Sequence, residues 1–285
     1  MAVSAFADEP KFLELLFSRR SVLVALIIFL IILALCALAA LIAPADPAQM
    51  SVRQRLTPPG SAFWLGADAF GRDVASRLLF AGQVSLAIGL GVAILSSIVG
   101  IFIGLLAGFF RQLDGLLSRL IDAMMAFPDI LLAIALVSIL GGSMVNVILA
   151  LSIVYAPRIA RIVRASTLVI RELPYVEAAR ALGTSTSRIM TTHVLRNIMS
   201  PIIVQGTFIF AYAMLAEAGL SFLGVGVDPS TPTWGTMINE GRQYIDQASY
   251  LIFFPGIAIS ISVLSLQLVG DGLRDALDPR LAKEV

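Results

Sequence analysis

Few side chains in this sequence are of the types that perform covalent or metal chemistry. There is one histidine, His193, and one cysteine, Cys36. A serine nucleophile needs a histidine base within hydrogen-bond reach, but a long apolar run that predicts a membrane-spanning helix separates His193 from Gly219-Leu220-Ser221. An H-E-x-x-H zinc pair is also absent from the sequence. We therefore expect no catalytic residue, no metal site and no cofactor bound by this chain.

Two acidic residues, Asp129 and Glu217, lie nearest the interior of predicted membrane spans. A charge within the hydrocarbon is costly unless it faces protein or water, so each is a candidate for lining a translocation path. The alternative for both is an interfacial position. Asp129 follows Pro128 at the start of one predicted helix, and Glu217 lies near the outer end of another.

Three glycines recur at four-residue spacing within one predicted span: Gly100, Gly104 and Gly108. This spacing places three positions without side chains on one helix face, where another helix can approach closely. The pattern predicts a helix-packing seam, within this chain or against a partner, rather than a ligand contact.

A polar segment of about forty residues separates two predicted spans and carries regularly placed arginines. Arg158, Arg161 and Arg164 recur every three residues and would line one helix face. Their alternative role is anchoring in lipid headgroups. Further on, the residues from Val176 predict a short helix of small side chains that stops at Gly183. Such a helix would present a shallow knob to another protein.

The elements that must position these residues are membrane helices. The chain of 285 residues is 58% hydrophobic and 14% charged, and its mean hydropathy is +0.92, outside the usual range of soluble domains. Its net charge of +1 gives no reason to expect nucleic acid as a partner. Apolar runs predict six helices, at about 21–43, 84–110, 123–140, 143–156, 198–222 and 250–270. The fourth is expected to continue through Pro157, and the first is too long for a cleaved signal segment.

The placement of lysine and arginine predicts the orientation. With the N-terminus inside, fifteen of these residues fall on the cytoplasmic side and five outside, which agrees with the positive excess of cytoplasmic loops. Both termini are then expected in the cytoplasm, with the segments 44–83 and 223–249 outside.

The cytoplasmic loop resembles a family motif. Its spacing matches the EAA loop of bacterial binding-protein-dependent ABC importers in the peptide-permease form. The matching residues are Glu177, Ala178, Ala179, Gly183, His193 and Leu195. The proline usual after that leucine is Arg196 here, so the exit from the motif differs.

Other stretches extend the resemblance to nearly the whole chain. Residues 65–77, LGADAFGRDVASR, resemble the signature before the second helix of the dipeptide, oligopeptide and nickel permeases, in their shorter C-type member. Ala67 stands where threonine is usual and Gln83 where arginine is frequent. Residues 217–224 and 270–280 also match that family.

The resemblance implies an all-α integral membrane protein with six transmembrane helices and the type I ABC importer transmembrane fold. Its organisation would be a cytoplasmic segment 1–20, a first transmembrane helix 21–43, an outer connector 44–83, a five-helix type-1 domain 84–273 with the EAA loop at about 166–197, and a cytoplasmic tail 274–285. Implied partners are a sister permease, two ATPase subunits that bind ATP and Mg²⁺, an extracytoplasmic substrate-binding protein and the bilayer of the bacterial plasma (inner) membrane. The EAA residues would couple the permease to the ATPases.

A secondary transporter driven by an ion gradient is the competing interpretation. Such proteins usually show a paired repeat within the chain, which the sequence lacks. No G-x-x-x-x-G-K-[ST] loop is present either, so the chain is not itself the ATPase. Peptides are the substrates expected from the resemblance, although nickel chelates, glutathione, opines and sugars are carried by related permeases. The outer segment 223–249 is a candidate for binding-protein contact, with a rigid connector as the alternative.

Overall fold

The computed structural model describes residues 19–277, which form a helical bundle. The helices are α2 (Arg20–Ala37), α3 (Ala39–Ile42), α4 (Val74–Phe109), α5 (Arg111–Met125), α6 (Asp129–Leu140), α7 (Met144–Ile170), α8 (Pro174–Ala181), α9 (Thr186–Arg188), α10 (Met199–Phe222), α11 (Trp234–Gly241) and α12 (Tyr250–Leu277). A π-helical segment, Ile189–Val194, and 3-10 turns at Val52–Gln54, Leu195–Ile198 and Arg242–Tyr244 complete the described elements.

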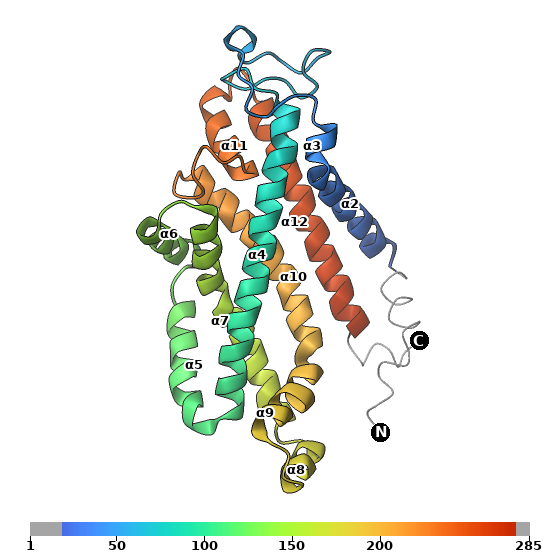
Figure 1. Cartoon of the computed structure of the whole chain (residues 1–285), viewed down its shortest axis with the longest axis vertical. Coiled ribbons are helices and arrows are strands. Elements are labelled where there is room, and N and C mark those ends of the chain that lie inside the picture. Colours follow the sequence, from blue (N-terminus) through green and yellow to red (C-terminus); the bar gives the residue numbers. More distant parts are fainter. Residues whose placement is uncertain (1–18, 278–285) are drawn as a thin grey trace.

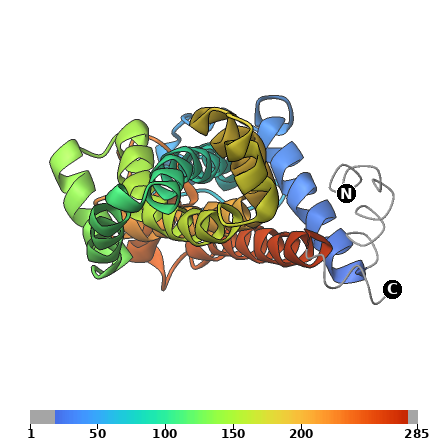
Figure 2. The ribbon, with the colours of Figure 1, turned by 90° about the horizontal axis from the view of Figure 1, so that it is seen from below.

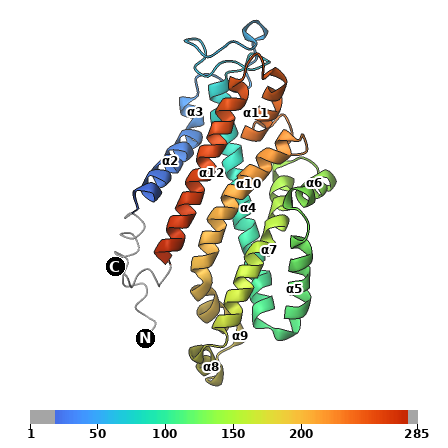
Figure 3. The same ribbon diagram turned by 180° about the vertical axis from the view of Figure 1, so that it is seen from behind.

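The bundle is elongated, and its long helices run roughly along the long axis (Figure 1). α11 and the segment 44–73 lie at one end, while α8 and α9 lie at the other (Figures 1 and 3). Seen along the axis, α2 and α5 flank opposite sides of the bundle (Figure 2). The two ends are therefore built from different segments, the connectors 44–73 and 223–249 at one and the loop after α7 at the other.

Five described helices are long and apolar enough to cross a membrane, and a sixth span is formed if α5 and α6 count together. The two are bent by 93° around Pro128, where the chain leaves the helical conformation. The expected single helix at 123–140 is therefore wrong. α6 alone has 12 residues, too few for about 30 Å of hydrocarbon.

The helix α4 begins ten residues earlier than expected. Asp73 caps it, because its Oδ2 accepts hydrogen bonds from the backbone N–H of Ser76 at 2.7 Å and from the Ser76 hydroxyl at 2.7 Å. The connector that begins at residue 44 thus ends at residue 73 rather than 83. With 36 residues, α4 is about 54 Å long and extends well beyond the hydrocarbon thickness.

Other boundaries also move. α7 continues through Pro157, as expected, and reaches Ile170, so Arg158, Arg161 and Arg164 belong to a bundle helix rather than to a loop. α12 extends to Leu277. Residues 274–277, which the sequence assigned to a cytoplasmic tail, are therefore helical. The first helix is interrupted at Leu38.

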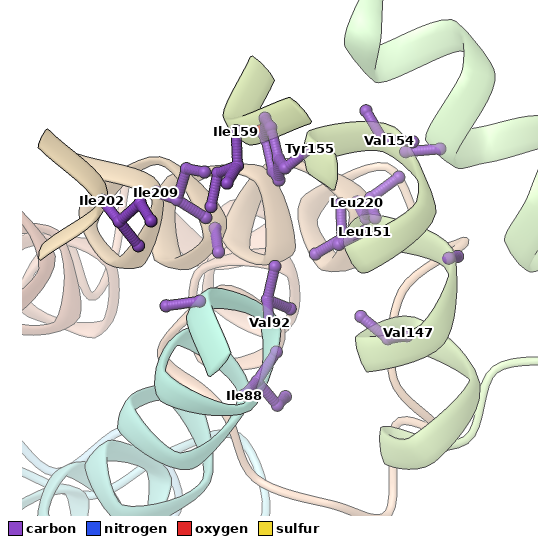
Figure 4. Packing of buried hydrophobic residues seen from close by; sticks show 14 of the residues in the cluster. Ile88, Val92, Val147, Leu151, Val154, Tyr155, Ile159, Ile202, Ile209 and Leu220 are labelled. Atoms are coloured by element: carbon purple, nitrogen blue, oxygen red, sulfur yellow. The ribbon is translucent and has the colours of Figure 1, made fainter. Parts of the chain in front are cut away.

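Two apolar clusters hold the bundle together. The larger joins α4, α6, α7 and α10 through buried side chains such as Val92, Leu151 and Ile209 (Figure 4). The second joins α2 to α4, α10, α11 and α12, with Cys36 and Trp234 among its buried members. The first helix is thereby packed against the five-helix body.

The contact between α4 and α7 depends on the three glycines. A Cβ atom at Gly104 would lie 2.6 Å from the carbonyl oxygen of Ala160, and one at Gly100 would lie 2.8 Å from that of Ala156. Gly108 packs in the same way against Thr167. The seam is therefore internal to this chain, with the backbone of α7 as the surface that the glycines contact.

Candidate functional site

The loop after α7 contains the EAA-like residues and ends α8 at a left-handed glycine. Gly183 has φ +79°, its N–H donates to the carbonyl of Arg180 at 3.0 Å, and the N–H of Thr184 donates to that of Ala179 at 3.0 Å. These bonds have the pattern of a Schellman C-cap. A Cβ at Gly183 would meet no atom within 4 Å, so the backbone angle alone favours glycine.

The outward surface of α8 is small and open. Glu177 and Ala178 are exposed, Ala179 is half-buried, and Leu182 is 86% exposed. On its inner side, α8 buries Val176. An exposed leucine beside two alanines gives the knob that the sequence predicts, at the far end of the bundle from α11 (Figure 3).

The structure places His193 and Leu195 in the support of this knob rather than on its surface. Both are half-buried, and the ring centroid of His193 lies 6.1 Å from that of Tyr175 in α8. Asn197 Nδ2 donates to the Tyr175 hydroxyl oxygen at 3.1 Å, and Leu195 packs against the larger apolar cluster. The motif residues therefore divide into an outward face and an anchor to the bundle.

The arginines of α7 form ion pairs within the chain. Each pairs with an aspartate of the bent pair: Arg158 with Asp129, Arg161 with Asp122 at 2.7 Å, and Arg164 with Asp114 at 2.5 Å. Anchoring in lipid headgroups stays a prediction for these residues. The acidic side chains of α5 and of the start of α6 are matched by the arginines of α7.

Glu217 is sealed inside the chain, with no exposed area. Its carboxylate accepts a hydrogen bond from the Ser221 hydroxyl at 2.7 Å and a longer one from the Ser85 hydroxyl at 3.4 Å. Ser85 Oγ in turn accepts from the backbone N–H of Trp234 at 3.1 Å. The network ties α4, α10 and α11 together. Asp129 and Glu217 are not brought together, since Glu217 does not line the groove beside Asp129.

A further ionic cluster joins the connector 44–73 to α11. The Asp68 carboxylate accepts from Arg72 Nε at 2.6 Å and from Arg77, and both arginines contact Glu240 at 2.8 Å. Burial, the largest single effect, raises the pKa of Asp68, but the hydrogen bonds from Arg72 and the charges of both arginines together lower it below its usual range. This cluster was not predicted from the sequence.

Comparison with known proteins shows the family. Residues 100–283 match the family model described as "Binding-protein-dependent transport system inner membrane component", and residues 12–59 match the N-terminal transmembrane domain of oligopeptide transport permease C. The fold is also that of a chain of the MetNI methionine ABC transporter, solved in inward-facing conformations. That match has a TM-score of 0.57 at 20% identity and covers 71% of this chain and 97% of the other.

Relatives with similar sequences are peptide-type permeases by name. A Brucella suis protein named as a peptide transport system permease is 51% identical over 94% of this chain and 91% of its own length. The di/tripeptide transport system permease DppC of Pseudomonas aeruginosa is 46% identical, covering 84% and 81%. The glutathione transport system permease GsiD of Pectobacterium atrosepticum is 43% identical, covering 78% and 74%.

The family match and the named relatives identify the transmembrane subunit of an ABC importer. The chain belongs to the family of binding-protein-dependent transport system inner membrane components and is a multi-pass ABC permease subunit, not an ATPase. This assignment favours ATP-driven import over transport driven by an ion gradient.

Proposed function

We propose that this chain forms half of the translocation path of a peptide importer in the bacterial inner membrane. Its named relatives carry peptides, di- and tripeptides or glutathione, which all share a peptide backbone with charged ends. The other half of the path would come from a sister permease, and a substrate-binding protein would deliver the solute from outside. Two ATPase subunits would bind the ATP and Mg²⁺.

The α8 loop is the docking site for one ATPase in this proposal. The supporting observation is its exposed surface of Glu177, Ala178 and Leu182, which projects from the bundle and is fixed behind by Tyr175 and His193. Glu177 lies in the first turn of α8, where a carboxylate interacts favourably with the positive end of the helix dipole. Movement of the ATPases would be transmitted through this knob and would shift the permease between inward-facing and outward-facing states.

The proposed orientation places α8 in the cytoplasm and α11 outside, with both termini in the cytoplasm. The paired arginines of α7 no longer count as loop charges, which leaves twelve basic residues inside against five outside. The excess still favours this orientation.

Two substitutions test the docking site. Gly183→Val places a β-branched residue at φ +79°, a backbone conformation that such residues resist. Glu177→Lys reverses a charge in the first turn of α8. We expect each variant to insert and to pair with the sister permease, but to lose ATPase co-purification, or substrate-stimulated ATP hydrolysis, together with at least about nine-tenths of the uptake.

Gly115→Val is the matched control. Gly115 also has open space around its missing side chain, but it lies within α5 and has no positive φ, so this variant should keep normal coupling. Normal coupled transport in both Gly183→Val and Glu177→Lys, measured in proteoliposomes, would show that α8 is not the docking site.

A further inference from the structure

A column of ion pairs runs along one flank of the bundle. The pairs Arg158–Asp129, Arg161–Asp122 and Arg164–Asp114 follow α7 toward its C-terminal end. Elsewhere, the exposed faces of α2, α4 and α12 carry large apolar side chains such as Ile31, Phe102 and Leu264. The apolar faces are suited to contact lipid, whereas the flank with the ion pairs is suited to contact water or protein.

The Arg158–Asp129 pair lies near the middle of α7, a helix long and apolar enough to cross a membrane. Arg158 is about 21 Å from the start of α7 and about 18 Å from its end, at 1.5 Å per residue. Its side chain is 32% exposed and that of Asp129 is 38% exposed. Partly exposed charges at this depth face water or protein rather than hydrocarbon.

A groove of about 230 Å³ opens beside this pair. Its lining includes Asp129, Tyr155 and Tyr212, with Leu151, Leu215 and Ala216 as apolar walls. The Arg158 guanidinium lies 5.3 Å from the ring centroid of Tyr155 and 5.6 Å from that of Tyr212, within range of cation–π attraction. The guanidinium therefore lies beside two residues of the groove lining, Tyr155 and Tyr212, and pairs with a third, Asp129.

We propose that this groove is a subsite for the charged ends of a peptide in transit. Arg158 would take the peptide carboxylate, Asp129 the ammonium group, and the two tyrosine rings would contact the backbone between them. The inference rests on the proposed peptide importer and adds the residues that contact its solute.

The Arg158–Asp129 pair suits such a role because a zwitterion can exchange with it. The incoming carboxylate and ammonium replace the two partners that Arg158 and Asp129 lose, so neither side chain is left uncompensated. After the peptide has left, Arg158 and Asp129 pair with each other again. Within the described residues, Arg161 makes no cation–π contact, and the side chains of Arg161 and Asp122 are 51% and 67% exposed. This ion pair does not line the groove and therefore serves as a control.

The test uses the full transporter, with sister permease, ATPases and binding protein, in proteoliposomes supplied with radiolabelled alanyl-alanine. The double variant Asp129→Asn/Arg158→Gln removes both charges and leaves neither partner unpaired. We expect its uptake to fall about tenfold or more, while ATP hydrolysis stimulated by the loaded binding protein stays within about twofold. The control Asp122→Asn/Arg161→Gln should import normally.

Uptake by the Asp129→Asn/Arg158→Gln variant equal to that of the wild type would overturn the subsite, because the charges would then serve only to pair with each other. If the wild-type transporter itself imports no alanyl-alanine, the proposed peptide function fails instead. The two failures are therefore distinguishable.

Crosslinking tests the same groove directly. With Tyr212→p-benzoylphenylalanine, we expect light to attach the labelled peptide to this chain during turnover, whereas Ile261→p-benzoylphenylalanine on the apolar face of α12 should not capture peptide. Crosslinks from position 212 to the sister permease alone would identify the flank as a subunit interface and would overturn the proposal.

Discussion

Arg77 shows how one charged side chain can be buried at the end of the bundle that carries α11. It is 3% exposed and contacts the carboxylates of Asp68 and Glu240. Arg72 bridges the same two acids from a more exposed position. The connector and α11, far apart in the sequence, are thereby joined by four charged residues.

Arg77→Met should destabilise the protein by about 3 kcal/mol, because it leaves the buried Asp68 and the half-buried Glu240 with only one partner arginine. In detergent, the midpoint of thermal unfolding should fall by roughly 8 °C. Arg242→Met, at an exposed arginine with no ion pair in the described part of the chain, is the control and should change the midpoint little. Equal shifts for both variants would contradict a specific role for the buried cluster.

At the scale of single residues, the sequence predicted local features such as helix ends better than it predicted which side chains contact each other. Gly183 was placed at a helix end from its neighbours alone, since a left-handed cap is a local property. Glu217 was singled out because it lies within a predicted membrane span. The hydrogen-bond network of Ser85, Ser221 and the start of α11 around it could not be predicted, because it joins residues far apart in the sequence. Its role in a path stays a prediction.

At the scale of elements, the contact between α4 and α7 is the most demanding sterically. A leucine at Gly104 would collide with the backbone of α7 at Ala160. Gly104→Leu should therefore push the helices apart and lower the thermal midpoint by roughly 5 °C.

Gly256→Leu is the corresponding control on α12, since a Cβ there would meet nothing within 4 Å. It adds the same side chain to a membrane helix at an open position. Unchanged thermal stability of the Gly104→Leu variant would mean that the seam can open without cost.

Element boundaries were predicted well where hydropathy changes abruptly and poorly where charges are paired. Arg77 made the first turns of α4 look like a connector, because the acids that neutralise it lie elsewhere in the fold. α5 was missed for the same reason. The signal available was a pattern: Asp114, Asp122 and Asp129 recur every seven or eight residues, and the arginines of α7 recur every three. The arginines line one face of α7, whereas the aspartates are divided between α5 and the start of α6.

At the scale of the whole molecule, the two ends of the bundle should lie on opposite sides of the membrane. Ser187 in α9 and Ser230, four residues before α11, are both exposed, and α9 and α11 lie at opposite ends of the bundle (Figure 1). In a Cys36→Ser background, Ser187→Cys should react with an impermeant maleimide only after the cytoplasmic side is opened, whereas Ser230→Cys should react in intact spheroplasts. Labelling of both from the same side would refute the proposed topology.

The column of ion pairs has a consequence for how the chain enters the membrane. α5 carries Asp114 and Asp122, whose partners on α7 are synthesised 50 and 39 residues later. A helix with unpaired charges partitions poorly into hydrocarbon. The bent pair must therefore wait at the insertion machinery until α7 emerges, and the three helices pass into the lipid together with each of these aspartates paired to an arginine.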